Sequence, residues 1–188
     1  MLKSADACYS NACDLLADAT MLSASSSWPR AAAMAILAEE EFSKAFMLRI
    51  CADQGRWDSN IYNALRKHSS KQGISQALRE WLELVVPNAL RIEEMNKHAF
   101  IQSQPSMFLT SNDLGPILDR ARKTLAKSSR DFLKQDALYV GIDESASTTS
   151  TPRTTTQAVA EACIGEARKF RAGLDLMSRD ERALDEWR

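Results

Sequence analysis

The residues best placed for chemistry are two glutamates and a lysine within the strongly apolar stretch 31–49. An α-helix turns by about 100° per residue, so the spacing predicts one apolar face made of Met34, Leu37, Ala38, Ala45 and Leu48. Glu41 falls in the middle of that face, Lys44 lies one turn further on, and Glu40 lies at its edge. A carboxylate facing a core is costly unless it is paired or hydrogen-bonded. The group is therefore either a functional site or a buried structural Glu–Lys pair.

A histidine and a second lysine follow on the next predicted helix. His68 continues the apolar face of that helix, and Lys71 comes three residues later. Consecutive helices joined by a short connection usually pack antiparallel, which would bring both residues close to Glu41 and Lys44. The four side chains suit acid–base work on a phosphodiester. His68 would move a proton, the lysines would hold the phosphate, and Glu41 would orient the imidazole. A purely structural polar cluster would use the same residues.

Two further patterns could contact nucleic acid. Arg91 and His98 are spaced to lie on one face of a helix, and this pair is an alternative catalytic site. A basic stripe follows on a long helix predicted over 114–138, with cations spaced three and four residues apart: Arg120, Lys123, Lys127, Arg130 and Lys134. The stripe either follows a nucleic-acid backbone or is simply a solvated face.

Metal and cofactor chemistry finds no support in the sequence. A di-metal helical bundle needs Glu-x-x-His pairs, and neither His68 nor His98 has a glutamate three residues before it. The cysteines and histidines lack the paired spacing of a zinc site. The sequence also contains no glycine-rich phosphate-binding loop and no nucleophile elbow. We therefore expect no metal and no cofactor.

Composition favours an all-α protein with one main domain. The chain has 188 residues, 45% of them hydrophobic, with only six glycines and five prolines, and a formal net charge of −1. No CxxC pair occurs among its four cysteines, Cys8, Cys13, Cys51 and Cys163, so we expect reduced thiols. Neither a signal peptide nor a membrane span is expected, which favours the cytoplasm. We predict a helical domain over 1–178 and a charged extension over 179–188.

Apolar periodicity and breakers divide the chain into helices. The predicted helices cover 4–23, 27–53, 59–71, 74–86, 88–99, 114–138 and 156–174. Gly73 is expected to interrupt the chain of helices, and Phe132 is expected in the core stripe of the 114–138 helix. Residues 103–115 and 143–156 are predicted to be loops, the second of them exposed. No strand pattern was found.

These residues resemble a known family. The run Ala33–Phe46, AMAILAEEEFSKAF, is similar to the central motif of the AbiV family of bacterial abortive-infection proteins. His68-Ser-Ser-Lys71 resembles the second motif of that family, and the segment from Lys134 to Val140 resembles a third. The resemblance spans about residues 11–170. Carried over to this chain, the marked residues are Glu40, Glu41, Lys44, His68 and Lys71.

The resemblance implies a HEPN-like antiparallel helical bundle, with one or two extra short helices, that acts in defence against phage. It further implies a homodimer that is an RNA-directed toxin or a metal-independent ribonuclease and halts growth or translation. Possible partners are RNA, the translation machinery and a phage-encoded activator protein. Many HEPN ribonucleases carry Arg-x4-6-His on a late helix, whereas Arg91 and His98 lie in mid-chain here. This departure leaves open a non-catalytic module that senses a phage protein or blocks translation.

Overall fold

The computed structural model describes residues 1–66, 71, 73–76, 78–79, 82–83, 129–139, 141–142, 144–150, 152 and 155–177. The elements within these ranges are α1 (Leu2–Ala24), α2 (Trp28–Asp53), α3 (Ser59–Arg66), α7 (Ser129–Leu138), β1 (Gly141–Ile142), β2 (Thr148–Ser150) and α8 (Gln157–Met177). The all-α prediction is confirmed, and the only strands in this part of the chain are the two short ones.

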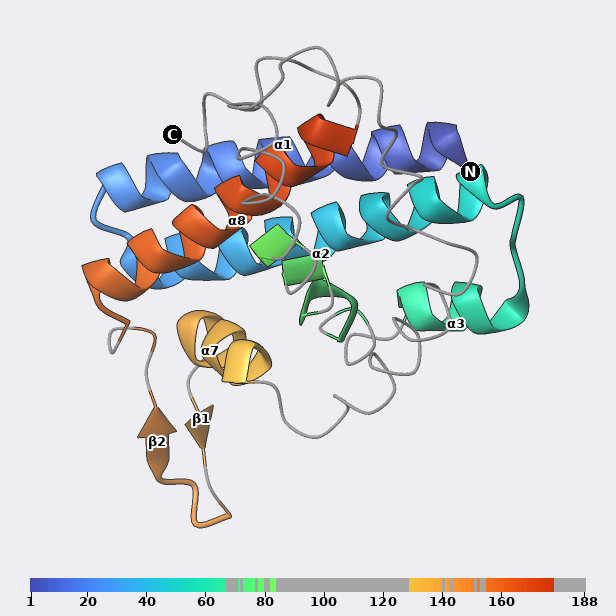
Figure 1. Ribbon diagram of the computed structural model, residues 1–188. Coiled ribbons are helices and arrows are strands. Elements are labelled where there is room, and N and C mark those ends of the chain that lie inside the picture. Colours follow the sequence, from blue (N-terminus) through green and yellow to red (C-terminus); the bar gives the residue numbers. More distant parts are fainter. Residues whose placement is uncertain are drawn as a thin grey trace.

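Helix α2 is the centre of the bundle. Helix α1 runs antiparallel beside it, α8 lies across both, and α7 packs on another side (Figure 1). The sequence explains this position, because α2 is apolar nearly all round and a helix of that kind is stable only when surrounded. Its buried residues include two phenylalanines, Phe42 and Phe46.

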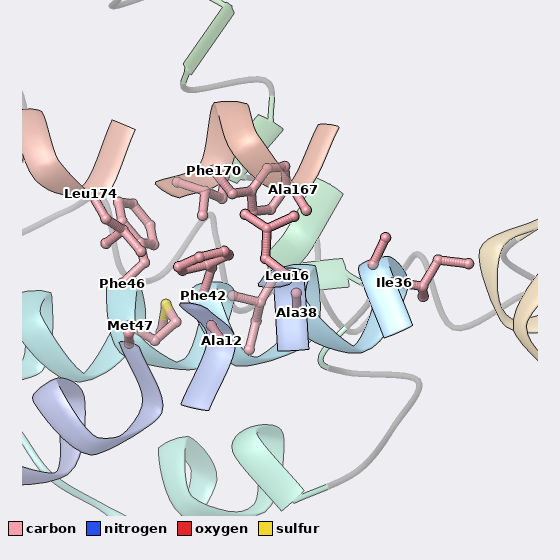
Figure 2. Close-up of a cluster of buried hydrophobic side chains, with 14 of the residues drawn as sticks. Ala12, Leu16, Ile36, Ala38, Phe42, Phe46, Met47, Ala167, Phe170 and Leu174 are labelled. Atoms are coloured by element: carbon pink, nitrogen blue, oxygen red, sulfur yellow. The ribbon is translucent and has the colours of Figure 1, made fainter. Parts of the chain in front are cut away.

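The core lies between α1, α2 and α8. Figure 2 shows Phe42 and Phe46 of α2 meeting Phe170 and Leu174 of α8, and all four side chains are fully buried. Small residues such as Ala12 let α1 approach closely on the other side (Figure 2). Interdigitation of large and small side chains at near-crystalline density is what gives such a core its rigidity.

Helix ends carry residues that are typical of helix starts and stops. Helix α2 starts after Ser27, with Pro29 in its first turn, although the Ser27 side chain makes no capping hydrogen bond. It ends before Gly55, whose φ of +60° is a left-handed conformation that glycine adopts without strain. Asp58 then caps α3, since its Oδ1 atom accepts hydrogen bonds from the backbone N–H groups of Asn60 (2.8 Å) and Ile61 (3.0 Å).

The described helical residues 71, 73–76 and 78–79 pack antiparallel to α2. The hydroxyls of Ser43 and Ser75 lie 2.7 Å apart, and Arg79 donates a hydrogen bond to Glu39. A later residue of the second segment thus contacts an earlier residue of α2, as it does when two helices run in opposite directions. The predicted break at Gly73 is wrong, because Gly73 is helical and buried. A glycine lowers helix propensity, but tertiary packing overrides that cost of about 1 kcal/mol.

Two other predictions on the C-terminal half need correction. Phe132 is not a core residue; 53% of it is exposed, while Leu133, Lys134 and Ala137 form the inward face of α7. The predicted loop over 143–156 contains β2, which pairs antiparallel with β1. A hairpin this short carries too few residues for an alternating pattern to be detected.

Candidate functional site

The three consecutive glutamates of α2 point to three different neighbours, because successive helical residues are rotated by about 100°. Glu39 and Glu40 are buried, with 2% and 3% of their surface exposed. Glu41 is half-buried. The prediction that Glu41 occupies the core-facing position is therefore wrong, and the two glutamates before it take the buried positions.

Glu39 is held between two arginines. Arg79 Nη2 donates a hydrogen bond of 3.3 Å to Oε2 of Glu39, and Nη2 of Arg130 on α7 lies 2.9 Å from Oε1. The second contact is an ion pair without hydrogen-bond geometry, since Oε1 accepts no hydrogen bond. Burial raises the pKa of Glu39 to about 7, although both arginines lower it and Glu166 raises it slightly. The carboxyl group therefore titrates near neutral pH.

The arginines extend this network to α8. Arg79 Nε donates to Oε2 of Glu166 at 3.1 Å, and its guanidinium lies 5.8 Å from the ring centre of Phe170. Arg130 Nη1 donates to the sulfur of Cys163 at 3.0 Å. Burial opposes ionisation of Glu166, but Lys169 and Arg79 outweigh it, so the pKa of Glu166 is lowered. One carboxylate of α2 is thus connected through two arginines to α8.

Glu40 forms a buried ion pair with α7. Lys134 on α7 donates a hydrogen bond of 2.6 Å to its Oε1 atom, and both side chains are at least 90% buried. The segment around Lys134 and the Glu-rich run are two of the three motifs quoted for the family resemblance, and the structure brings them into contact. The expected exposed basic stripe is not found at its C-terminal end, because Arg130 and Lys134 turn toward the glutamates of α2.

Glu41, the most accessible of the three glutamates, belongs to a third group. It forms an ion pair with Lys44, and their side chains are 17% and 21% exposed. The Cys8 thiol of α1 lies close enough to Glu41 for the carboxylate to raise its pKa. Burial raises the pKa of the Cys8 thiol, and the nearby ammonium groups of Lys44 and Lys71 oppose that effect. Three segments, α1, α2 and the helix containing Lys71, therefore contribute charged or nucleophilic groups to one place.

The predicted site is thus divided between two environments. Glu40 is paired inside the bundle, whereas Glu41, Lys44 and Lys71 lie around Cys8. The other predicted site residues, His68, Arg91, His98, Arg120, Lys123 and Lys127, lie outside the described residues. Four residues of these groups were not predicted from the sequence: Cys8, Glu39, Arg79 and Glu166. The Glu-Glu-Glu run was the available signal for Glu39, since three consecutive carboxylates on a helix cannot all avoid a buried position when every face is covered.

Two general findings limit the chemistry of the part of the chain that the structure describes. It contains no group of three or more His, Cys, Asp or Glu side chains that could hold a metal ion. None of its helices has both the length and the apolar character needed to cross a bilayer.

Comparison with known proteins identifies the family. The AbiV family model of HEPN type matches residues 1–172 of the 188. The matched region includes α1, α2 and about three quarters of α8, together with every residue of the three charged groups. Neither a curated protein nor a solved structure matches the chain. The helical bundle and the match along nearly its whole length lead to one conclusion: the chain belongs to the AbiV family of HEPN-type abortive-infection proteins.

Proposed function

We propose that this protein acts in abortive infection as an RNA-directed toxin, a metal-independent ribonuclease whose phosphate-binding group is Glu41, Lys44 and Lys71. The observation that carries the proposal is that Glu41 is the most accessible of the three glutamates. Glu39 and Glu40 are enclosed by their ion pairs, whereas Glu41 and Lys44 keep part of their surface in solvent and have a second lysine nearby. Two ammonium groups beside one carboxylate leave a net positive charge for a phosphodiester.

The proposed reaction needs only side chains of this group and His68. The 2′ oxygen of a ribose forms a bond to the adjacent phosphorus, and the bond from phosphorus to the 5′ oxygen of the next nucleotide breaks. His68 takes the proton from the 2′-hydroxyl and returns it to the departing 5′ oxygen. Lys44 and Lys71 offset the negative charge that grows on the phosphate oxygens. Glu41 holds Lys44 in place and orients the imidazole.

RNA cleavage by purified protein tests this proposal. We expect Lys44→Ala and Lys71→Ala each to lower the cleavage rate at least tenfold and to relieve growth arrest on expression. His68→Ala should abolish cleavage while circular dichroism shows unchanged helical content. Arg30→Ala is the matched control, because Arg30 is an exposed cation of the same helix α2 far from the group. Full cleavage by the lysine variants would exclude this site.

A second candidate function is a non-catalytic binding module that senses a phage protein or blocks translation. It is favoured by the ion pairs that the buried Glu39 and Glu40 make with three cationic partners, which have the character of a structural element. In this case wild-type protein cleaves no RNA but still arrests growth. His68→Ala would then lower the melting temperature by several degrees through loss of a structural contact. Cleavage by the wild type with a folded, inactive His68 variant excludes this alternative.

A further inference from the structure

Two aromatic side chains lie on the surface where α2 ends and α3 begins. Trp57 and Tyr62 are each 47% exposed. Their ring centres are 6.5 Å apart and the ring planes meet at 69°, so they form an edge-to-face pair. Figure 1 shows α3 beneath the C-terminal end of α2, on the side of the molecule away from the β1–β2 hairpin. Two large rings that stay half in solvent contribute little to the core, so their position calls for another explanation.

A guanidinium extends this aromatic pair. Arg66 lies one helical turn after Tyr62, and its guanidinium carbon is 5.3 Å from the centre of the Tyr62 ring. Its Nη1 atom also donates a hydrogen bond of 3.3 Å to the Tyr62 hydroxyl. Both contacts fix the plane of the guanidinium, and such a plane is itself a surface on which a nucleic-acid base can stack. Trp57, Tyr62 and Arg66 together are called the aromatic platform.

The chain around the aromatic platform is locally basic. Four residues between 56 and 71 are arginine or lysine and one is acidic, whereas the net charge of the whole chain is −1. The basic residues are Arg56, Arg66, Lys67 and Lys71. The acidic residue, Asp58, is already engaged, because it accepts two capping hydrogen bonds of α3 and lies 3.5 Å from Nε of Arg56. Such an excess of cations attracts a polyanion.

The aromatic platform is also tied to the proposed phosphate-binding group by the chain itself. Lys71 belongs to that group and follows Arg66 by five positions. A fully extended chain of five residues spans at most about 18 Å. A strand of RNA with its scissile phosphate at Lys71 therefore reaches the platform within a few nucleotides.

We infer that the aromatic platform holds unpaired bases of a single-stranded RNA. One base stacks on the indole of Trp57 and another on the guanidinium plane of Arg66, while the neighbouring cations hold the backbone. Stacking accepts every base, because each base has a π-face, so the platform selects unpaired bases rather than a particular sequence. This inference rests on the proposed function, and it names the form of RNA that the same site takes.

Binding of an uncleavable RNA to the full-length protein tests the inference. The probe is a fluorescein-labelled octamer of 2′-O-methyladenosine, because the proposed reaction needs a free 2′-hydroxyl. We expect fluorescence anisotropy to show that Trp57→Ala and Arg66→Ala each weaken binding at least about fivefold, since one stacking surface is lost. Trp57→Phe should retain most of the affinity, because a phenyl ring also stacks. The octamer paired with its complement should bind at least about fivefold more weakly, since its bases are already stacked on each other.

Phe132→Ala is the matched control. Phe132 is an aromatic residue with a similar exposure of 53%, but it lies on α7. This variant should bind the octamer as the wild type does, and melting temperatures show that every variant is folded.

Three results would overturn the inference: no binding of the octamer at 1 mM, equal binding of the duplex, or unchanged binding by both the Trp57→Ala and the Arg66→Ala variants. If those two variants keep full RNA binding but no longer arrest growth, the platform binds a protein instead and the inference is wrong.

The failure of this inference can be told apart from the failure of the proposed function. RNA cleavage is measured with Lys44→Ala, whereas binding of the octamer needs no cleavage. Octamer binding that depends on Trp57, in a protein that cleaves no RNA, removes the ribonuclease and keeps the platform. RNA cleavage that depends on Lys44 but is unchanged in Trp57→Ala does the reverse.

Discussion

At the scale of single residues, the most unusual group is the Glu39 carboxyl. It lies in the middle of the bundle between Arg79 and Arg130, and burial raises its pKa to about 7 from an ordinary 4.5. The native state therefore keeps a proton that the unfolded chain loses between pH 4.5 and pH 7. Folding stability that depends on this proton is fully present below pH 4.5 and is lost as the pH rises through 7.

Glu39→Gln should remove this pH dependence. The shift of pKa corresponds to at most about 3 kcal/mol of unfolding free energy. We expect the free energy of unfolding of the wild type to fall, relative to that of Glu39→Gln, as the pH is raised from 5 to 7.5. Urea denaturation at a series of pH values measures the difference. Parallel pH curves for the two proteins would contradict a protonated native carboxyl group.

Lys134 should be far more important for stability than a surface lysine. Lys134→Ala leaves the Glu40 carboxylate buried without its 2.6 Å partner, and such a loss costs about 3–5 kcal/mol. Lys169→Ala is the control, because Lys169 also pairs with a glutamate but its side chain is 55% exposed. Removal of an exposed pair costs under about 1 kcal/mol. Thermal unfolding distinguishes the two variants. Similar melting temperatures would show that the Glu40 carboxylate does not depend on Lys134 in the folded protein.

At the scale of elements, two glycines of α8 have opposite roles. A Cβ atom at Gly173 would overlap the buried side chain of Leu82, so this glycine permits the close approach of two helices. Gly165 faces open space. The same substitution at the two positions therefore tests the packing of one helix on its two sides.

Gly173→Ala should destabilise the protein by about 1–3 kcal/mol, the usual cost of overpacking a core. Gly165→Ala should stabilise it by about 0.5–1 kcal/mol, because alanine has the higher helix propensity and meets no obstacle. Chemical denaturation of both variants measures the two changes. Equal effects of the two substitutions would argue against the packing of Leu82 on α8.

At the scale of the whole molecule, the fold should need no metal. The described residues hold their charged groups in place with one another, as Arg79 and Lys134 do, and contain no cluster of metal ligands. We expect EDTA to leave the melting temperature and the proposed RNA cleavage unchanged. Addition of Mg²⁺ or Zn²⁺ after chelation is the control. A loss of more than a few degrees on chelation would reveal a metal site elsewhere in the chain.

Much of the bundle could be predicted from the sequence, because the position of most helices depends on residues close together in the chain. Apolar periodicity located α1, α2 and α8, and the predicted bounds at 53 and 59 located the connection between α2 and α3. The buried positions of α2 could not be predicted in the same way. A helix covered on all sides has no single apolar face, so the phase of its pattern does not say which of Glu39, Glu40 and Glu41 is enclosed.

The partners of the glutamates could not be predicted from the sequence either. Arg130 and Lys134 lie in a regular basic stripe, and such a stripe is usually solvated. Only the contact between α7 and α2 reveals that these cations neutralise buried carboxylates. The same contact explains why Phe132 is exposed, since it lies on the side of α7 away from Leu133 and Ala137.

The sharing of Glu39 by two arginines has a consequence for how such proteins can diverge. Loss of either arginine leaves the buried Glu39 carboxyl with one cationic neighbour instead of two, and loss of Glu39 removes a partner from both arginines, so each step alone carries a cost. The cost of a change at one of the three positions therefore depends on the residues at the other two. A deep mutational scan should therefore find strong epistasis among these three sites. In evolution, substitutions at the three positions should occur together rather than one at a time.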